Sequence, residues 1–134
     1  MNKSLLTKHK LIESYFNALK VNNATILTDL FSPNAMMSRP NQAFDYPYTL
    51  IGKDKINQYW NKIFSEYNIS DLTIKEIEKV NERNTYIIKH VTNIKTLNKP
   101  IESKTLSFTS LVFDSDNKIE KFVEIFYPLT KIKI

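Results

Sequence analysis

The 134-residue sequence contains no cysteine and only one glycine. The absence of cysteine excludes disulfide bonds, thiolate metal ligands and a cysteine nucleophile, and it suits a reducing compartment such as the cytoplasm. Because Gly52 stands alone, the sequence contains none of the glycine-rich motifs that cradle the phosphates of nucleotides. We therefore predict that any chemistry proceeds without a cofactor.

Arginine is also scarce. Arg39 and Arg83 are the only arginines among 19 basic residues, and the net charge of +5 is spread along the chain. Nucleic-acid-binding domains usually cluster their basic residues and use arginine for bidentate contacts, so this pattern argues against nucleic acid as a partner. The N-terminal segment, rich in lysine and glutamate, lacks the apolar run of a signal peptide or a membrane span. We predict a soluble, cytoplasmic protein without membrane contact.

Length and composition indicate one folded domain covering residues 1–134. Apolar residues make up 42% and charged residues 25%, which is close to the composition of ordinary globular domains. The chain contains two histidines, His9 and His90, and they do not have the spacing of a metal-binding motif. The sequence therefore predicts no metal site.

The first half of the chain has helical periodicity. Apolar residues recur at i, i+3, i+4 and i+7 over residues 4–20 and 53–67, which predicts two amphipathic helices. A shorter helix between them is expected to run through Phe31 and to end at Pro33. Residues 40–49 contain two prolines and three aromatic residues and have no helical period, so we predict a loop that covers an apolar site.

From Leu72 onward the apolar period changes to two, which is typical of strands. The predicted strands are a brief one at 35–39 and four longer ones at 72–80, 85–96, 102–113 and 118–127. Three helices followed by an antiparallel meander predict an α+β fold in which a curved sheet packs around the N-terminal helices.

Both faces of the predicted strands are apolar, although three helices can cover only one of them. The outer face, which includes Val91, Val112 and Ile125, would leave a larger apolar patch than monomers usually expose. We therefore predict a homodimer that packs through the outer sheet face.

The segments LIESYFNAL, TILTDLFSPNA, GKDKINQYW and FDSDNKIEKFVEIF, taken in order, resemble the SnoaL-like branch of the nuclear transport factor 2-like superfamily. The resemblance covers nearly the whole chain. It implies a cone-shaped α+β fold and, in this branch, small cyclases and isomerases. The same fold also serves ligand binders and protein adaptors, so the resemblance is more specific for fold than for function.

The resemblance places Glu124 where the cyclases carry an acidic residue in the last strand, usually aspartate, that is proposed as their catalytic acid or base. Alternation puts Glu124 between Phe122 and Phe126 on the inner face. Desolvation there would raise its pKa and suit proton transfer near neutral pH. The alternative is a structural Glu124 that faces solvent or pairs with a lysine.

Further polar residues follow from the strand pattern and from similarity to ketosteroid isomerases. His90 lies on the same face as Tyr86, either as a proton relay or as a core histidine. Tyr15 matches the isomerases' hydrogen-bonding tyrosine, and Thr109 falls at their second acidic position. Arg39 replaces their aspartate base, which disfavours steroid isomerisation. Arg39 either anchors a ligand oxygen or pairs with Glu124.

Two functions remain open from the sequence. The first is a pocket protein, an enzyme or binder for a small apolar or aromatic ligand with a carbonyl group, in which Glu124 and His90 carry out proton transfer. The second is a non-catalytic ligand-binding or adaptor module of the same fold. The predicted ligand-binding residues are Tyr15, Arg39, Trp60, Tyr86, Thr109, Phe122 and Phe126.

Overall fold

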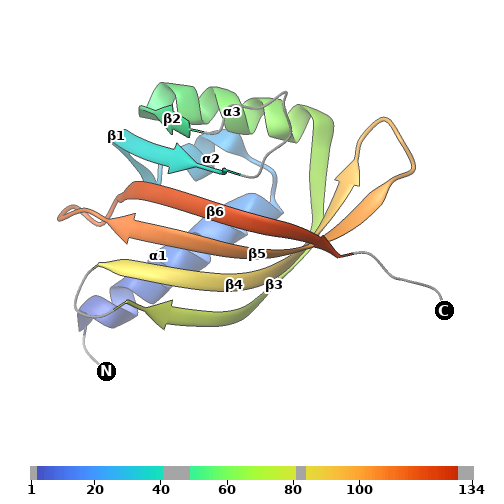
Figure 1. Cartoon of the computed structure of the whole chain (residues 1–134). Coiled ribbons are helices and arrows are strands. Elements are labelled where there is room, and N and C mark those ends of the chain that lie inside the picture. The colour runs from blue at the N-terminus through green and yellow to red at the C-terminus, as the bar shows by residue number, and fades with distance from the viewer. Residues whose placement is uncertain (1–2, 41–48, 81–83, 130–134) are drawn as a thin grey trace.

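A computed structural model describes residues 3–40, 49–80 and 84–129 (Figure 1). Within these ranges, none of the helices combines the length and the hydrophobicity that a bilayer span requires. The helices are α1 (Lys3–Lys20), α2 (Ala24–Thr28) and α3 (Lys53–Glu66). The strands are β1 (Phe31–Ser38), β2 (Thr49–Ile51), β3 (Tyr67–Lys79), β4 (Thr85–Thr96), β5 (Glu102–Phe113) and β6 (Ile119–Leu129).

The two long helices follow the predicted periodicity. On α1 the apolar stripe is buried against the sheet, with Tyr15 fully buried. On α3 the stripe buries Ile56, Tyr59 and Trp60. Burial of these stripes drives helix formation here, because an isolated helix of this length is only marginally stable in water.

The segment after α1 differs from the prediction. The short helix ends at Thr28, and Phe31 already begins β1, so the expectation of a helix through Phe31 was wrong. Pro33 lies inside the strand, where the pairing with β6 is irregular between Phe31 and Met36. A proline has no N–H to donate to a neighbouring strand, so this irregular stretch accommodates it.

The six strands form one sheet in the order β2-β1-β6-β5-β4-β3. All neighbours are antiparallel except β1 and β6, which are parallel, so the expectation of a wholly antiparallel sheet was wrong at this pair. The strands come from opposite ends of the chain, and the long connection between them permits a parallel pairing. β3 begins at Tyr67, directly after α3 and earlier than expected. The predicted covering loop falls largely on residues 41–48, outside the described residues.

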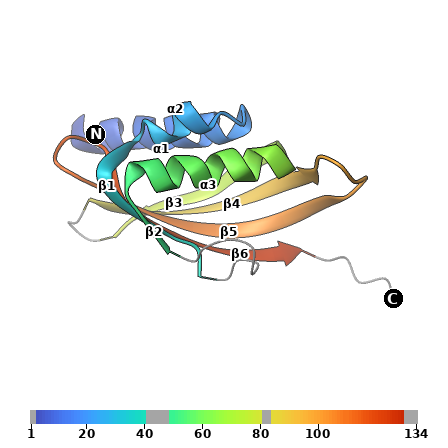
Figure 2. The ribbon, with the colours of Figure 1, turned by 90° about the horizontal axis from the view of Figure 1, so that it is seen from above.

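All three helices lie on one face of the curved sheet, and the opposite face is bare (Figure 2). The core between helices and sheet contains aromatic and aliphatic side chains, with Tyr15, Tyr86 and Phe122 among the largest that are fully buried. The predicted α+β architecture, with three N-terminal helices packed in a curved sheet, is confirmed.

Candidate functional site

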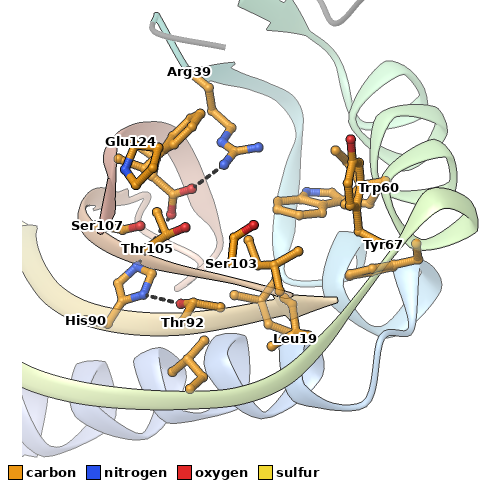
Figure 3. Close-up of a pocket in the computed structure, with 17 residues that line it drawn as sticks. Leu19, Arg39, Trp60, Tyr67, His90, Thr92, Ser103, Thr105, Ser107 and Glu124 are labelled. Carbon is orange, nitrogen blue, oxygen red and sulfur yellow. Dashed lines mark hydrogen bonds and ion pairs between the residues drawn. The ribbon is translucent and has the colours of Figure 1, made fainter. Parts of the chain in front are cut away.

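A cavity of about 270 Å³ lies between α3 and the inner face of the sheet (Figure 3). The residues from α1, α3 and β3 are almost all apolar, and the polar groups come from β4, β5 and β6, with Arg39 reaching in from the end of β1. The lining residues are Leu19, Arg39, Trp60, Ile63, Phe64, Tyr67, Ile69, Leu72, His90, Thr92, Ile94, Ser103, Thr105, Ser107, Glu124, Phe126 and Pro128.

The inner face of each long strand is divided along its length. On β5, Leu111 and Phe113 are buried in the core, whereas Ser103, Thr105 and Ser107 line the cavity. The antiparallel register aligns the same division on the neighbouring strands, since Ser107 lies opposite both His90 and Phe126. One end of the sheet therefore builds the core, and the other end builds the site.

Glu124 forms a buried ion pair with Arg39. Arg39 Nη2 lies 3.0 Å from Glu124 Oε1, and the two side chains are only 13% and 7% exposed. The guanidinium also donates a hydrogen bond to Tyr59 and lies over the ring of Phe126, 4.6 Å from its centroid. Of the two roles considered for Arg39, the structure contains the pairing with Glu124.

The pKa of Glu124 is displaced in the direction opposite to the prediction. Burial raises it, but the Arg39 guanidinium, contacts with His90 and the Thr109 hydroxyl together outweigh burial and lower the pKa from 4.5 to about 2. The expectation of a raised pKa was wrong, because it counted desolvation and not the charge partner. Glu124 is therefore an ionised carboxylate at neutral pH.

The Thr109 side chain links the ion pair to His90, and Thr92 and Phe16 also contact the imidazole. The hydroxyl of Thr109 donates to Glu124 Oε2 at 2.6 Å and lies 2.8 Å from His90 Nε2. The other ring nitrogen, Nδ1, lies 3.0 Å from Thr92 Oγ1. The Phe16 ring packs against the imidazole with 4.8 Å between centroids. His90 is thus held on both nitrogens and supported by α1.

The structure brings five of the nine predicted site residues to the cavity: Arg39, Trp60, His90, Glu124 and Phe126. The other four are buried and do not line the cavity: Tyr15, Tyr86, Thr109 and Phe122.

Tyr15 is the buried residue whose environment differs most from its predicted role. Its ring packs against Phe31 and Phe122, and its hydroxyl has no hydrogen-bond partner among the described residues. Burial, together with the nearby Glu124 carboxylate, raises the pKa of Tyr15 well above its usual value. The hydroxyl is therefore neutral, and it is buried within electrostatic range of the Glu124–Arg39 pair.

The sequence reasoning missed most of the cavity wall. Thr92, Ser103, Thr105 and Ser107 supply hydroxyl groups that it assigned to no function. A signal was present, because alternate serine and threonine residues on an inward strand face are unusual in an apolar core. The apolar wall from α3 and β3 carried no comparable signal, because its residues follow the same pattern as core residues.

No group of three histidine, aspartate or glutamate side chains in the described ranges is arranged to hold a metal ion. At the cavity itself, Glu124 is already compensated by Arg39 and by hydrogen bonds. The lining offers hydroxyl groups, an imidazole and a guanidinium, which suit hydrogen bonding to a neutral, oxygen-containing molecule.

The cone of helices and sheet, with a polar and apolar cavity inside it, is typical of proteins that enclose small molecules. No protein-family model matches this sequence, and no curated protein matches it. Solved structures do match. A protein of Bacillus subtilis provisionally described as an isomerase has a TM-score of 0.85 and 15% identity, with 95% of this chain and 90% of that chain covered.

Two further structures extend the comparison. An epoxide hydrolase of Mycobacterium tuberculosis, of the LEH-like type, has a TM-score of 0.74 and 10% identity, with 91% of this chain and 84% of that chain covered. A protein of Shewanella denitrificans, provisionally described as a SnoaL-like polyketide cyclase, has a TM-score of 0.71 and 15% identity, with 90% of each chain covered. The chain has the nuclear transport factor 2-like fold, which confirms the resemblance at the level of the fold.

Proposed function

We propose that this protein binds a small, mostly apolar molecule with a carbonyl or similar oxygen and promotes proton transfer on it without a cofactor. The observation that carries this proposal is the convergence of Arg39, Glu124 and His90 at one side of a cavity whose other side is apolar. Small-molecule sites usually have this form, a mainly apolar pocket with a few polar groups that orient the ligand.

The size of the cavity limits the ligand. Its volume of about 270 Å³ is just below the range of about 300–1,000 Å³ that is usual for ligand sites. Trp60 and Phe64 are stacked with 5.6 Å between ring centroids and offer a flat wall to an aromatic or cyclic ligand. We therefore favour a one- or two-ring molecule.

The charges favour His90 over Glu124 as the group that exchanges protons. A carboxylate with a pKa of about 2 is a weak base at neutral pH, whereas an unprotonated imidazole nitrogen has a lone pair that can accept a proton. In this proposal Glu124 acts as a fixed negative charge that would stabilise a protonated His90, whose Nε2 lies 3.5 Å from Glu124 Oε2. Arg39 supplies N–H groups toward a ligand oxygen that gains negative charge.

Binding can be tested with two ligands of matched shape. Acetophenone has a carbonyl oxygen where α-methylstyrene has a methylene group, so the pair isolates the contribution of the oxygen. Isothermal titration calorimetry should show acetophenone binding more tightly. Thr105→Trp, which fills the cavity, should abolish binding, and Ser110→Trp on the outer face of the same strand should not. Binding that survives Thr105→Trp would contradict the proposed site.

Proton transfer can be tested on the same molecule. A base beside the carbonyl would accelerate exchange of the acetophenone methyl protons for deuterium in D₂O, which proton NMR follows directly. We expect exchange faster than in buffer, and loss of that acceleration in His90→Gln. Binding without accelerated exchange would instead favour the non-catalytic ligand-binding module.

We also propose that two copies of the chain pack through the bare face of the sheet. Phe108 lies opposite Ile125 in the β5–β6 register, and Phe108 and Tyr127 form an edge-to-face contact with 6.4 Å between centroids. These three side chains are 37%, 39% and 51% exposed on a face that no helix covers. A contiguous apolar patch of this kind usually marks an interface. Sedimentation velocity at micromolar concentration should give a dimer, and a monomer would contradict this proposal.

A further inference from the structure

The hydroxyl of Thr109 lies between the Glu124 carboxylate and the imidazole of His90. It lies 2.6 Å from Glu124 Oε2 and 2.8 Å from His90 Nε2, and it is completely buried. An ionised carboxylate only accepts hydrogen bonds, and a threonine hydroxyl has a single hydrogen to donate. That hydrogen is used toward Glu124, so toward His90 the hydroxyl oxygen can only accept.

This chain of donors and acceptors determines where the imidazole carries its hydrogen. Since Thr109 accepts from Nε2, Nε2 must be protonated, and in a neutral ring Nδ1 must then be unprotonated. Nδ1 lies 3.0 Å from the hydroxyl of Thr92, which lines the cavity. We infer that Thr109 is a positioning residue, which transmits the charge of Glu124 to fix His90 as the Nε2–H tautomer and leaves Nδ1 as the proton acceptor.

The inference defines a proton path that rests on the proposed function. A ligand proton passes to Thr92 Oγ1 while the Thr92 hydroxyl proton passes to His90 Nδ1, so the hydroxyl is restored and the ring becomes an imidazolium. The electron pair of the broken bond remains on the ligand as an enolate. The reverse transfer returns a proton to another ligand atom, and the protein ends in its starting state.

The position of His90 between two packed elements supports this role. Phe16 from α1 covers the ring, and the charged Glu124 carboxylate on β6 lies on the side of Nε2. Direct contact between Nε2 and Glu124 Oε2 at 3.5 Å is too long for a good N–H···O hydrogen bond. The shorter route through the Thr109 hydroxyl therefore carries the orienting interaction.

Nitrogen NMR of the histidine rings tests the inference without any ligand. The two-bond ¹⁵N–¹H spectrum distinguishes the Nε2–H tautomer, the Nδ1–H tautomer and the imidazolium. The chain has only two histidines, so in the variant His9→Gln every histidine signal comes from His90. At neutral pH we expect a single Nε2–H tautomer. An Nδ1–H tautomer, or an imidazolium with both nitrogens protonated, would overturn the inference.

Three variants test whether Thr109 and Glu124 fix the tautomer of His90. Thr109→Val removes the hydroxyl with little change of shape and should convert the single tautomer into a mixture, whereas Thr109→Ser should retain the single tautomer. Glu124→Gln should also give a mixture, because the new amide can donate to Thr109 and release its hydrogen toward His90. A single Nε2–H tautomer in Thr109→Val would exclude a positioning role for Thr109. None of these spectra depends on ligand binding, so failure of the proposed function would leave them unchanged.

Discussion

Replacement of Glu124 by glutamine should strongly destabilise the fold. Glutamine resembles the protonated form of glutamate, so the displacement of the Glu124 pKa from 4.5 to about 2 measures what the negative charge contributes. At about 1.4 kcal/mol per pKa unit, this corresponds to about 3 kcal/mol of folding free energy. A loss of folding free energy of similar size is expected when Arg39 is left buried without its charge partner.

The assay is thermal unfolding of wild type and Glu124→Gln at pH 7. For a domain of this size, about 3 kcal/mol lowers the melting temperature by roughly 10 °C. Glu120→Gln is the matched control, because Glu120 lies exposed on the same strand, and it should change the melting temperature by less than about 2 °C. The double variant Arg39→Met/Glu124→Gln should recover part of the loss, since it removes the uncompensated charge.

The pH dependence of the difference provides an independent check. Because the folded state lowers the pKa of Glu124, the stabilisation is complete above about pH 4.5 and is lost as the pH falls toward 2. The difference in the free energy of unfolding between wild type and Glu124→Gln should therefore shrink to about 1 kcal/mol at pH 3. A melting temperature of Glu124→Gln equal to that of the control, or a gap independent of pH, would refute the reasoning.

Three further predictions concern other residues. Tyr15→Phe removes a buried hydroxyl that has no hydrogen-bond partner among the described residues. Urea unfolding should therefore show a free energy of unfolding about 1 kcal/mol higher than that of wild type, and a decrease of the same size would contradict this prediction. Ile125→Lys should shift the proposed dimer toward monomer in sedimentation velocity, because it buries an unpaired charge, while Asn98→Lys in the exposed β4–β5 turn should not. Phe122→Ala should cost about 3–5 kcal/mol, and Phe126→Ala, at the cavity, less than half as much; equal costs would contradict the division between core and cavity.

Periodicity in the sequence was sufficient to predict most of the fold. The helical stripe of α1 and the alternation along β4, β5 and β6 are consequences of one-sided burial, and they appear directly as patterns of apolar residues. The parallel pairing of β1 with β6 was not predicted, because neither strand's pattern records the direction of its neighbour. The break at Pro33 was placed at a helix end when it belongs to an irregular strand.

The site was less predictable for a related reason. Alternation assigns a residue to the inner face but not to a position along the strand, so Tyr86 and Phe122 were predicted at the ligand although they lie in the core. The pairing of Arg39 with Glu124 was one of two alternatives that the sequence left open, and the structure contains it. The direction of the Glu124 pKa was missed because the expectation of a raised pKa counted burial and not this charge partner.

The β1–β6 register has a consequence for the accuracy of folding. Ser38 lies opposite Val123, so the next residues along the two parallel strands are Arg39 and Glu124, the buried pair. A shift of β6 by one residue would turn Glu124 to the outer face and would leave the Arg39 guanidinium buried beside an apolar side chain. Val123 and Ile125 are both apolar, so at the position of Glu124 itself hydrophobic burial would discriminate only weakly between the two registers. The ion pair therefore favours the native register of β1 and β6, and its loss should allow sheets with a shifted register to form during refolding.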